Sequence, residues 1–143
     1  MAAALLSADA WPIVLSFFAT MEAVSWFAKS FLPYVAQYVK GPQTLQELQE
    51  AVKTPAIGTE VHHIVEQTPA RREGFSEDMI EGKENRVRIS YFKHLEISAW
   101  YSKINYNSPF NGVTPRSYLR SKAWDEKYEV GLDALRYFGV IKK

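Results

Sequence analysis

Histidine carries the most obvious chemical potential in this sequence, because it occurs only three times and two copies are adjacent. His62 and His63 lie in "GTEVHHIVEQ", and His94 follows "ENRVRISYFK". A neutral imidazole binds cations, and the same ring accepts a proton near neutral pH. Neighbours in a strand point to opposite faces, so at a strand end one histidine can face a cation while the next stays free as a base. The pair therefore predicts a site that combines a metal ligand with a general base.

The sequence also restricts which metal sites are chemically reasonable. It contains no cysteine, which excludes disulfides and thiolate-bound zinc. Two histidine ligands are too few for a closed structural zinc site, which needs four protein ligands. An open site that completes its shell with water and a substrate phosphate fits better. Such a site suits metal-assisted hydrolysis of a phosphodiester, in which a base deprotonates the attacking water.

The elements that must position these histidines are predicted to follow one another along the chain as strand, loop, strand and helix. Apolar residues at Val61, Ile64 and Val65 favour a strand, and the segment 67–85 has the Pro, Gly and charge content of a long loop. Alternation of charged and apolar residues in "RVRIS" predicts a second strand with one solvent-exposed face. Helical spacing of apolar residues then predicts a helix over 91–103, which carries His94.

Further helices are predicted on both sides of this unit. One or two helices are expected over about 10–28 and 33–39, and a further short helix should begin after Thr44, with Glu47 completing a capping box. A final helix should begin at Pro115, capped by Thr114, and end at Gly139. The predicted fold class is therefore α+β and mostly helical, with residues 1–57 as a helical N-terminal segment and residues 58–143 as the functional domain.

Length, apolar content and charge narrow the function classes. A chain of 143 residues buries one core, and its composition is that of a globular protein. No uncharged apolar run reaches the roughly 20 residues of a spanning helix, and no basic region precedes the apolar N-terminus as in a cleavable signal peptide. Residues 1–70 carry three Lys/Arg against six acids and residues 71–143 carry fourteen against ten, so a polyanion should meet the second half.

Several basic residues surround the histidines in sequence and could neutralise phosphates. The candidates for substrate binding are Arg71, Arg72, Arg86, Arg88 and Lys93. A solvated surface position is the alternative for each of them taken singly.

The pattern "HH", "IVEQ", "EN" and a later "KH" at a helix start resembles the HNH/endonuclease VII nuclease superfamily, also called His-Me finger or ββα-metal. Within it, the chain is similar to C-terminal nuclease domains of bacterial polymorphic toxins delivered by contact-dependent, Rhs or type VI routes. The resemblance is most specific over 58–101, and the segment 115–140 is similar to the closing helix of many of those domains. It implies a ββα-metal core, a two-stranded antiparallel hairpin plus a helix, with extra helices at both ends.

The resemblance also implies roles for individual residues. By motif, His62 and His94 are metal ligands, His63 is the general base, and Asn85 orients that base or braces the loop between the strands. The implied cofactor is a divalent cation, with Mg²⁺ expected and Mn²⁺, Zn²⁺ or Ni²⁺ as alternatives.

The function that follows from the resemblance is non-specific cleavage of DNA by an antibacterial toxin. Its expected partners are DNA, a cognate immunity protein, and a larger parent toxin chain or secretion machinery. It would act in the target-cell cytoplasm as a secreted or injected effector.

Three alternatives remain open from the sequence. RNA could be the substrate, the nuclease could belong to a phage or to genome maintenance, or residues 1–57 could make the protein a non-enzymatic membrane-active or interaction module. Asn85 could equally be a turn residue without contact to any histidine.

Overall fold

The computed structural model describes residues 11–143, and the chain forms two compact units, Met1–Pro33 and Tyr34–Lys143. We predicted a boundary between residues 57 and 58. The structure divides the chain earlier because the segment 34–57 packs with the strands. Leu48, for example, is 3% exposed and belongs to the same core cluster as Val87.

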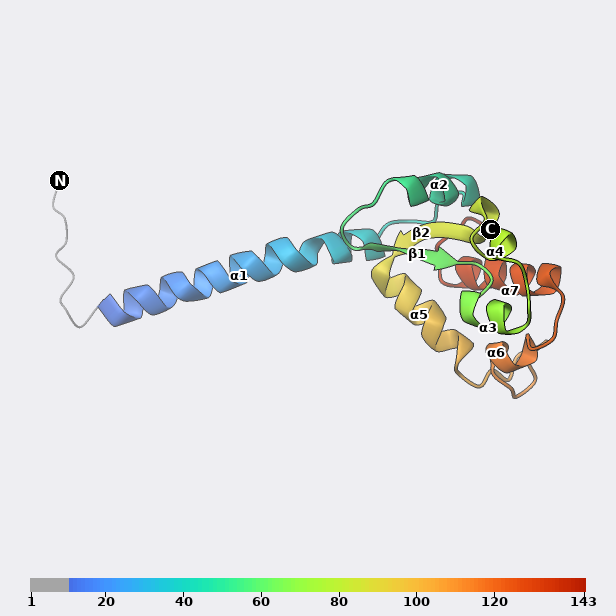
Figure 1. Ribbon diagram of the computed structural model, residues 1–143. Helices are drawn as coiled ribbons and strands as arrows, with labels where there is room; N and C mark the ends of the chain where they lie inside the picture. The colour runs from blue at the N-terminus through green and yellow to red at the C-terminus, as the bar shows by residue number, and fades with distance from the viewer. Residues whose placement is uncertain (1–10) are drawn as a thin grey trace. The chain divides into compact units, whose positions relative to one another are not determined.

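A single helix, α1 (Trp11–Tyr38), spans the N-terminal segments where we predicted one or two helices (Figure 1). Pro33 lies inside it, where a proline removes a backbone hydrogen bond. The residues after Pro33 are held by tertiary contacts: Tyr34 and Tyr38 both contact the ring of Phe92, and Tyr38 donates a hydrogen bond to Glu96. Among the described residues, no helix has the length and apolarity needed to cross a membrane.

The two predicted strands are present and form an antiparallel hairpin of β1 (Thr59–His63) and β2 (Arg86–Ser90). In this register His62 lies opposite Val87 and His63 lies opposite Arg86. Val87 is fully buried while Arg86 is partly exposed, as the alternation in "RVRIS" predicted. β1 ends at His63, so the histidine pair occupies a strand end.

Helices cover the two faces of this hairpin (Figure 1). α5 (Tyr91–Tyr101) contacts both strands on one face, and Ser90 caps its N-terminus. On the other face lie α2 (Leu45–Glu50), with the predicted Thr44 capping box, and the 3₁₀ turn η2 (Ala51–Lys53). The fold is therefore α+β, with a two-stranded antiparallel hairpin between helices.

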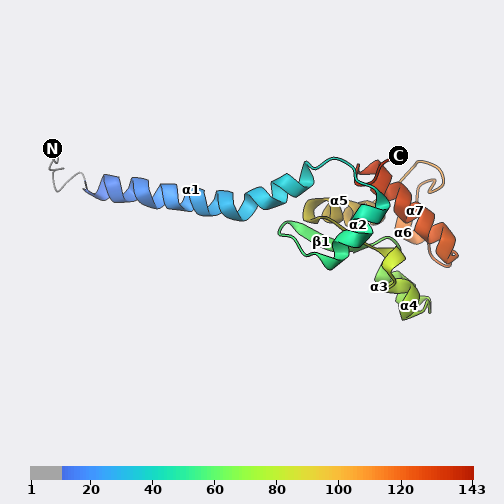
Figure 2. The same cartoon turned by 90° about the horizontal axis from the view of Figure 1, so that it is seen from above.

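The connection between the strands was predicted as a loop and is instead largely helical. It contains α3 (Gln67–Arg72), α4 (Glu77–Ile80) and the 3₁₀ turn η3 (Lys83–Asn85). Figure 2 shows α3 and α4 projecting from the end of the hairpin. Buried Ile80 and Ala70 form a small core of their own with Val65, which gives these short helices an apolar contact that their sequence periodicity did not indicate.

The C-terminal segment forms two helices, α6 (Pro115–Tyr118) and α7 (Trp124–Tyr137), where we predicted one. The break between them lets buried Lys127 donate to the carbonyl of Leu119 at 2.6 Å and pair with Glu73 at 2.7 Å. α7 approaches the end of β1 closely at Gly131. A Cβ there would lie 2.2 Å from the carbonyl oxygen of Ile64, so only glycine fits.

Candidate metal and phosphodiester site

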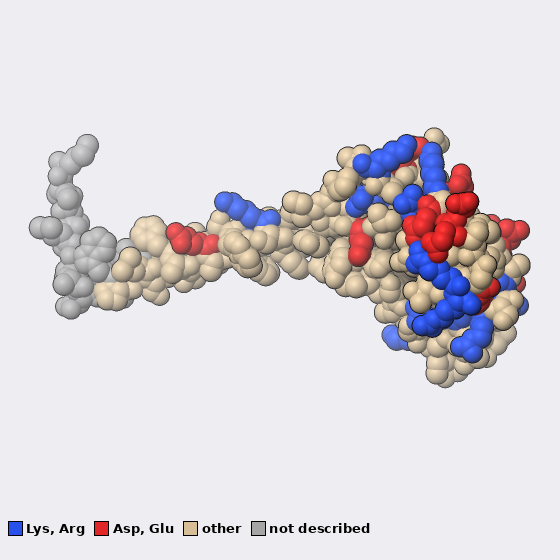
Figure 3. Space-filling view, viewed as in Figure 1, with Lys and Arg blue, Asp and Glu red and all other residues tan. Residues whose placement is uncertain are grey.

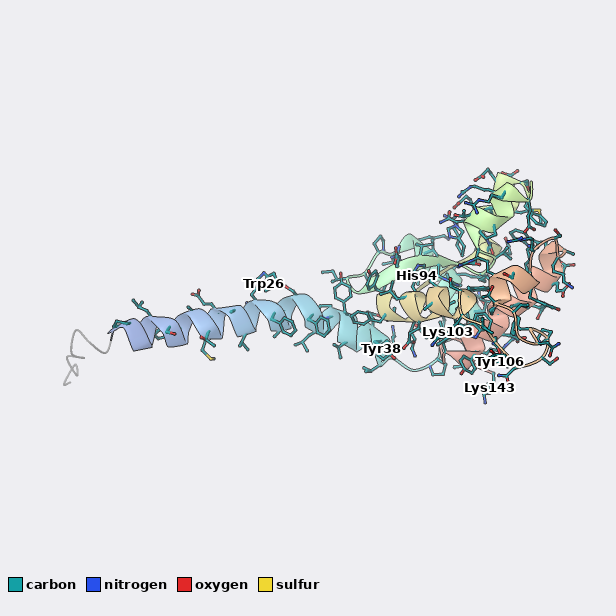
Figure 4. All side chains as sticks on the ribbon, turned by 90° about the horizontal axis from the view of Figure 1, so that it is seen from below. Trp26, Tyr38, His94, Lys103, Tyr106 and Lys143 are labelled. Atoms are coloured by element: carbon teal, nitrogen blue, oxygen red, sulfur yellow. The ribbon has the colours of Figure 1, made fainter. Side chains whose placement is uncertain are left out.

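His62 lies on β1 and His94 lies on α5, and the two side chains face each other. Their Nδ1 atoms lie 3.2 Å apart, and the rings meet edge to face. Strand alternation directs His62 to the face that α5 covers, and His94 lies one turn into that helix. Figure 4 labels His94 on α5, next to the strands. The fold thus joins two imidazoles that are 32 residues apart in sequence.

Burial determines the chemical state of His62. The side chain is only 4% exposed, and its Nε2 atom has no hydrogen-bond partner among the described residues. Burial, with smaller contributions from His94 and His63, lowers the pKa of His62 to about 3. His62 is therefore a neutral imidazole at physiological pH, which is the form that binds metal ions.

The two imidazoles suit a shared cation. Nitrogen ligands lie about 2.0–2.1 Å from a zinc-sized ion, so two nitrogens 3.2 Å apart can contact the same ion. Glu60 lies on the same face of β1, with its Oε2 atom 3.9 Å from Nε2 of His94. Carboxylates in this position commonly orient a metal-binding histidine. Within residues 11–143, no group of three or more His, Asp or Glu side chains is arranged to hold a metal.

His63, the next residue of β1, contacts Glu81. Its Nε2 atom lies 3.2 Å from Oε2 of Glu81. The hydrogen bond to His63 lowers the pKa of Glu81, and Arg71 contributes to the same effect with a hydrogen bond of 2.8 Å. Because an ionised carboxylate only accepts hydrogen bonds, neutral His63 carries its proton on Nε2 and keeps a lone pair on Nδ1.

The side-chain hydrogen bonds of Asn85 go to backbone groups and close the base of the connection between the strands. Asn85 is 1% exposed. Its Oδ1 atom accepts from the backbone of Val65 at 2.7 Å, while its Nδ2 atom donates to the carbonyls of Val65 and Ile80. These bonds tie the exit of β1 to the start of β2. Asn85 therefore holds the backbone immediately after His63 in place.

All three histidines line one pocket of about 370 Å³. Its other walls come from α3, α5 and α6, which supply Glu66, Gln67, Thr68, Pro69, Arg72, Ser98, Tyr101 and Arg116. Tyr101 is 1% exposed, and burial raises the pKa of its hydroxyl, which stays protonated. The pocket is large enough for a small ligand or a segment of a polymer.

Of the five basic residues predicted to bind substrate, Arg72 lines this pocket. Arg71 is held by Glu77 and Glu81, and Arg86 places Nη1 4.0 Å from Glu81.

Arg88 and Lys93 have structural roles outside the pocket. Arg88 donates to the carbonyls of Ala51 and Val52. Lys93 lies over the ring of Tyr38, at 4.5 Å from its centroid. These contacts occupy their charged groups.

Three residues of the site were absent from our sequence predictions. Glu81 follows α4 in the connection and contacts His63. Glu66 and Arg116, which are 50 residues apart, form a bidentate ion pair. The proline and capping threonine around Arg116 predicted a helix start. No local pattern indicated that this start would meet the histidines.

Comparisons with known proteins add no relatives: the chain matches no protein-family profile, no curated protein and no solved structure.

Proposed function

We propose that this protein is a metal-dependent endonuclease that hydrolyses phosphodiester bonds of DNA. The observation that carries the proposal is the placement of His62 and His94 with their Nδ1 atoms 3.2 Å apart, in the same pocket as His63. In this proposal β1, β2 and α5 form the ββα-metal core implied by the sequence resemblance.

His62 and His94 would hold a divalent cation, with Mg²⁺ expected. Such a cation supplies stabilisation of negative charge on the phosphate and on the leaving oxygen. Support for this assignment comes from the neutral state of buried His62 and from Glu60 beside His94. Both features favour imidazoles as ligands.

His63 would act as the general base. The hydrogen bond to Glu81 holds the ring and keeps the proton on Nε2, so Nδ1 accepts a proton from the attacking water. The water oxygen forms a bond to phosphorus while the bond from phosphorus to the leaving sugar oxygen breaks. The leaving oxygen takes a proton from solvent, and His63 later returns its proton to solvent.

The biological setting we propose is that of a toxin delivered into a target-cell cytoplasm and blocked by a cognate immunity protein. Its support is the sequence resemblance, together with the excess of Lys and Arg after residue 70. RNA is the second substrate candidate, since the proposed site recognises a phosphodiester and has no feature specific to deoxyribose.

Parallel incubation of the protein with plasmid DNA and tRNA tests the proposal, in Mg²⁺, in Mn²⁺ and in EDTA. We expect nicking and linearisation of the plasmid with either metal and no cutting in EDTA. Cutting of tRNA alone would move the substrate to RNA, and cutting that persists in EDTA would contradict the metal mechanism.

A further inference from the structure

Beside the histidine pocket lies a second hollow of about 300 Å³, lined by Pro69, Arg72, Glu73, Arg116 and Arg120. The two hollows share Pro69, Arg72 and Arg116 in their walls, so they adjoin. Figure 3 shows Lys and Arg side chains gathered over α3 and α6, where these residues lie.

The carboxylates in these walls are already neutralised. Glu66 is paired with Arg116, and Glu73 is paired with Lys127, whose side chain is 4% exposed. Four cations and two carboxylates therefore leave a net charge of +2 along the groove, carried by the two remaining arginines.

Arg72 and Arg120 are the groups that remain available. Both are exposed, and within residues 11–143 neither guanidinium has a hydrogen bond or an ion pair. Arg72 ends α3, and Arg120 follows the last turn of α6. Their positions contrast with that of Arg71, whose guanidinium is held by Gln67, Glu77 and Glu81.

We propose that the groove from His63 past Arg72 to Arg120 binds the phosphate backbone of the nucleic-acid strand beside the scissile bond. This inference rests on the proposed function, because the groove opens into the histidine pocket. The two guanidiniums would contact phosphates on one side of the cleavage point. Guanidiniums pair with phosphate oxygens through paired N–H donors, and such contacts carry no sequence information. Arg120 thereby joins Arg72 as a substrate-binding residue, and both would act on any sequence.

The test is equilibrium binding of a short fluorescein-labelled oligonucleotide, followed by fluorescence anisotropy in EDTA. Single-stranded DNA and RNA of the same sequence are compared between about 50 and 200 mM salt. The variants are Arg72→Gln, Arg120→Gln and the double variant. The control is Arg136→Gln, which removes the same charge from a partly exposed arginine on α7 that is paired with Asp133.

We expect each groove substitution to weaken binding. The negative slope of the logarithm of the association constant against the logarithm of salt concentration should become shallower by about one, for DNA and RNA alike. In the double variant the slope should become shallower by about two, while in Arg136→Gln it should stay as in wild type. Because the side chains of Arg72 and Arg120 are exposed and have no partner among the described residues, thermal melts should match wild type. Groove variants that bind like Arg136→Gln would overturn the inference.

Two results separate this inference from the proposed function. A groove-dependent slope in a protein that cuts neither DNA nor RNA would keep the groove and remove the nuclease. Metal-dependent cutting combined with unchanged slopes would keep the nuclease and remove the groove.

Discussion

His62 and His94 present their Nδ1 atoms to each other at 3.2 Å, one from the end of a strand and one from the first turns of the next helix. The two nitrogens can share a single proton, or a metal cation can replace that proton between them. The side chain of His62 is 4% exposed, and its Nε2 atom has no hydrogen-bond partner within residues 11–143. This relationship determines the first prediction.

Removal of either imidazole should abolish tight binding of a divalent cation. We expect His62→Ala and His94→Ala each to lower Mn²⁺ or Zn²⁺ affinity at least about 100-fold, because losing an outer partner of a ligand alone costs about 10–100-fold. Titration calorimetry without nucleic acid measures this directly. His63→Ala is the matched control and should bind within about threefold of wild type, because His63 faces Glu81. Equal affinity in all three variants would contradict the ligand assignment.

Glu81 should act as a positioning residue for His63. We expect Glu81→Ala to lower kcat about tenfold or more with KM little changed, because the ring loses the acceptor that fixes its proton on Nε2. Glu81→Gln should retain more activity, since an amide oxygen still accepts that hydrogen bond.

Glu77→Gln is the control for Glu81, because Glu77 contacts Arg71 without touching His63. A drop in kcat of the same size in Glu77→Gln would assign the effect to the arginine network instead of to the histidine.

Asn85 should contribute to stability through its three buried hydrogen bonds. Asn85→Ala leaves two carbonyls and one N–H of the backbone without a partner, and we expect a loss of about 3 kcal/mol in the free energy of unfolding. Asn85→Asp should be no better, because a carboxylate oxygen would then face the carbonyls of Val65 and Ile80. Urea unfolding measures both, with exposed Gln46→Ala expected to stay within about 0.5 kcal/mol of wild type. A loss below 1 kcal/mol in both Asn85 variants would contradict the role.

Gly131 should show the reverse of the usual preference in helices. Gly to Ala in a helix interior normally stabilises by about 1 kcal/mol. Here the new Cβ would meet the carbonyl of Ile64, so Gly131→Ala should destabilise by about 2 kcal/mol or more and move the end of β1. Thermal melts and cutting rates report the two effects, with exposed Glu129→Ala as a control. A stabilised Gly131→Ala protein would show that α7 does not pack on β1 as described.

Periodic features of this fold could be predicted from the sequence. Alternation located β2, apolar spacing located α5, and Thr44 with Glu47 located α2. These predictions rest on interactions between residues close in the chain, which is why they are confirmed.

Features set by long-range contacts could not be predicted in this way. The continuation of α1 beyond Pro33 depends on Phe92 from α5, and the break after α6 depends on the buried pair of Lys127 and Glu73. The same limit applies to the site. The histidines could be proposed from residue type and spacing, whereas Glu81 depends on a connection folded into short helices.

The most direct test of the central claim is the rate of plasmid cutting by His63→Ala in Mn²⁺, under conditions where wild type and Arg136→Gln are active. Loss of a general base lowers rates about 10²–10⁴-fold, so we predict a drop of at least about 100-fold with metal affinity retained. A His63→Ala protein that folds, binds metal and cuts within about threefold of wild type would contradict the account.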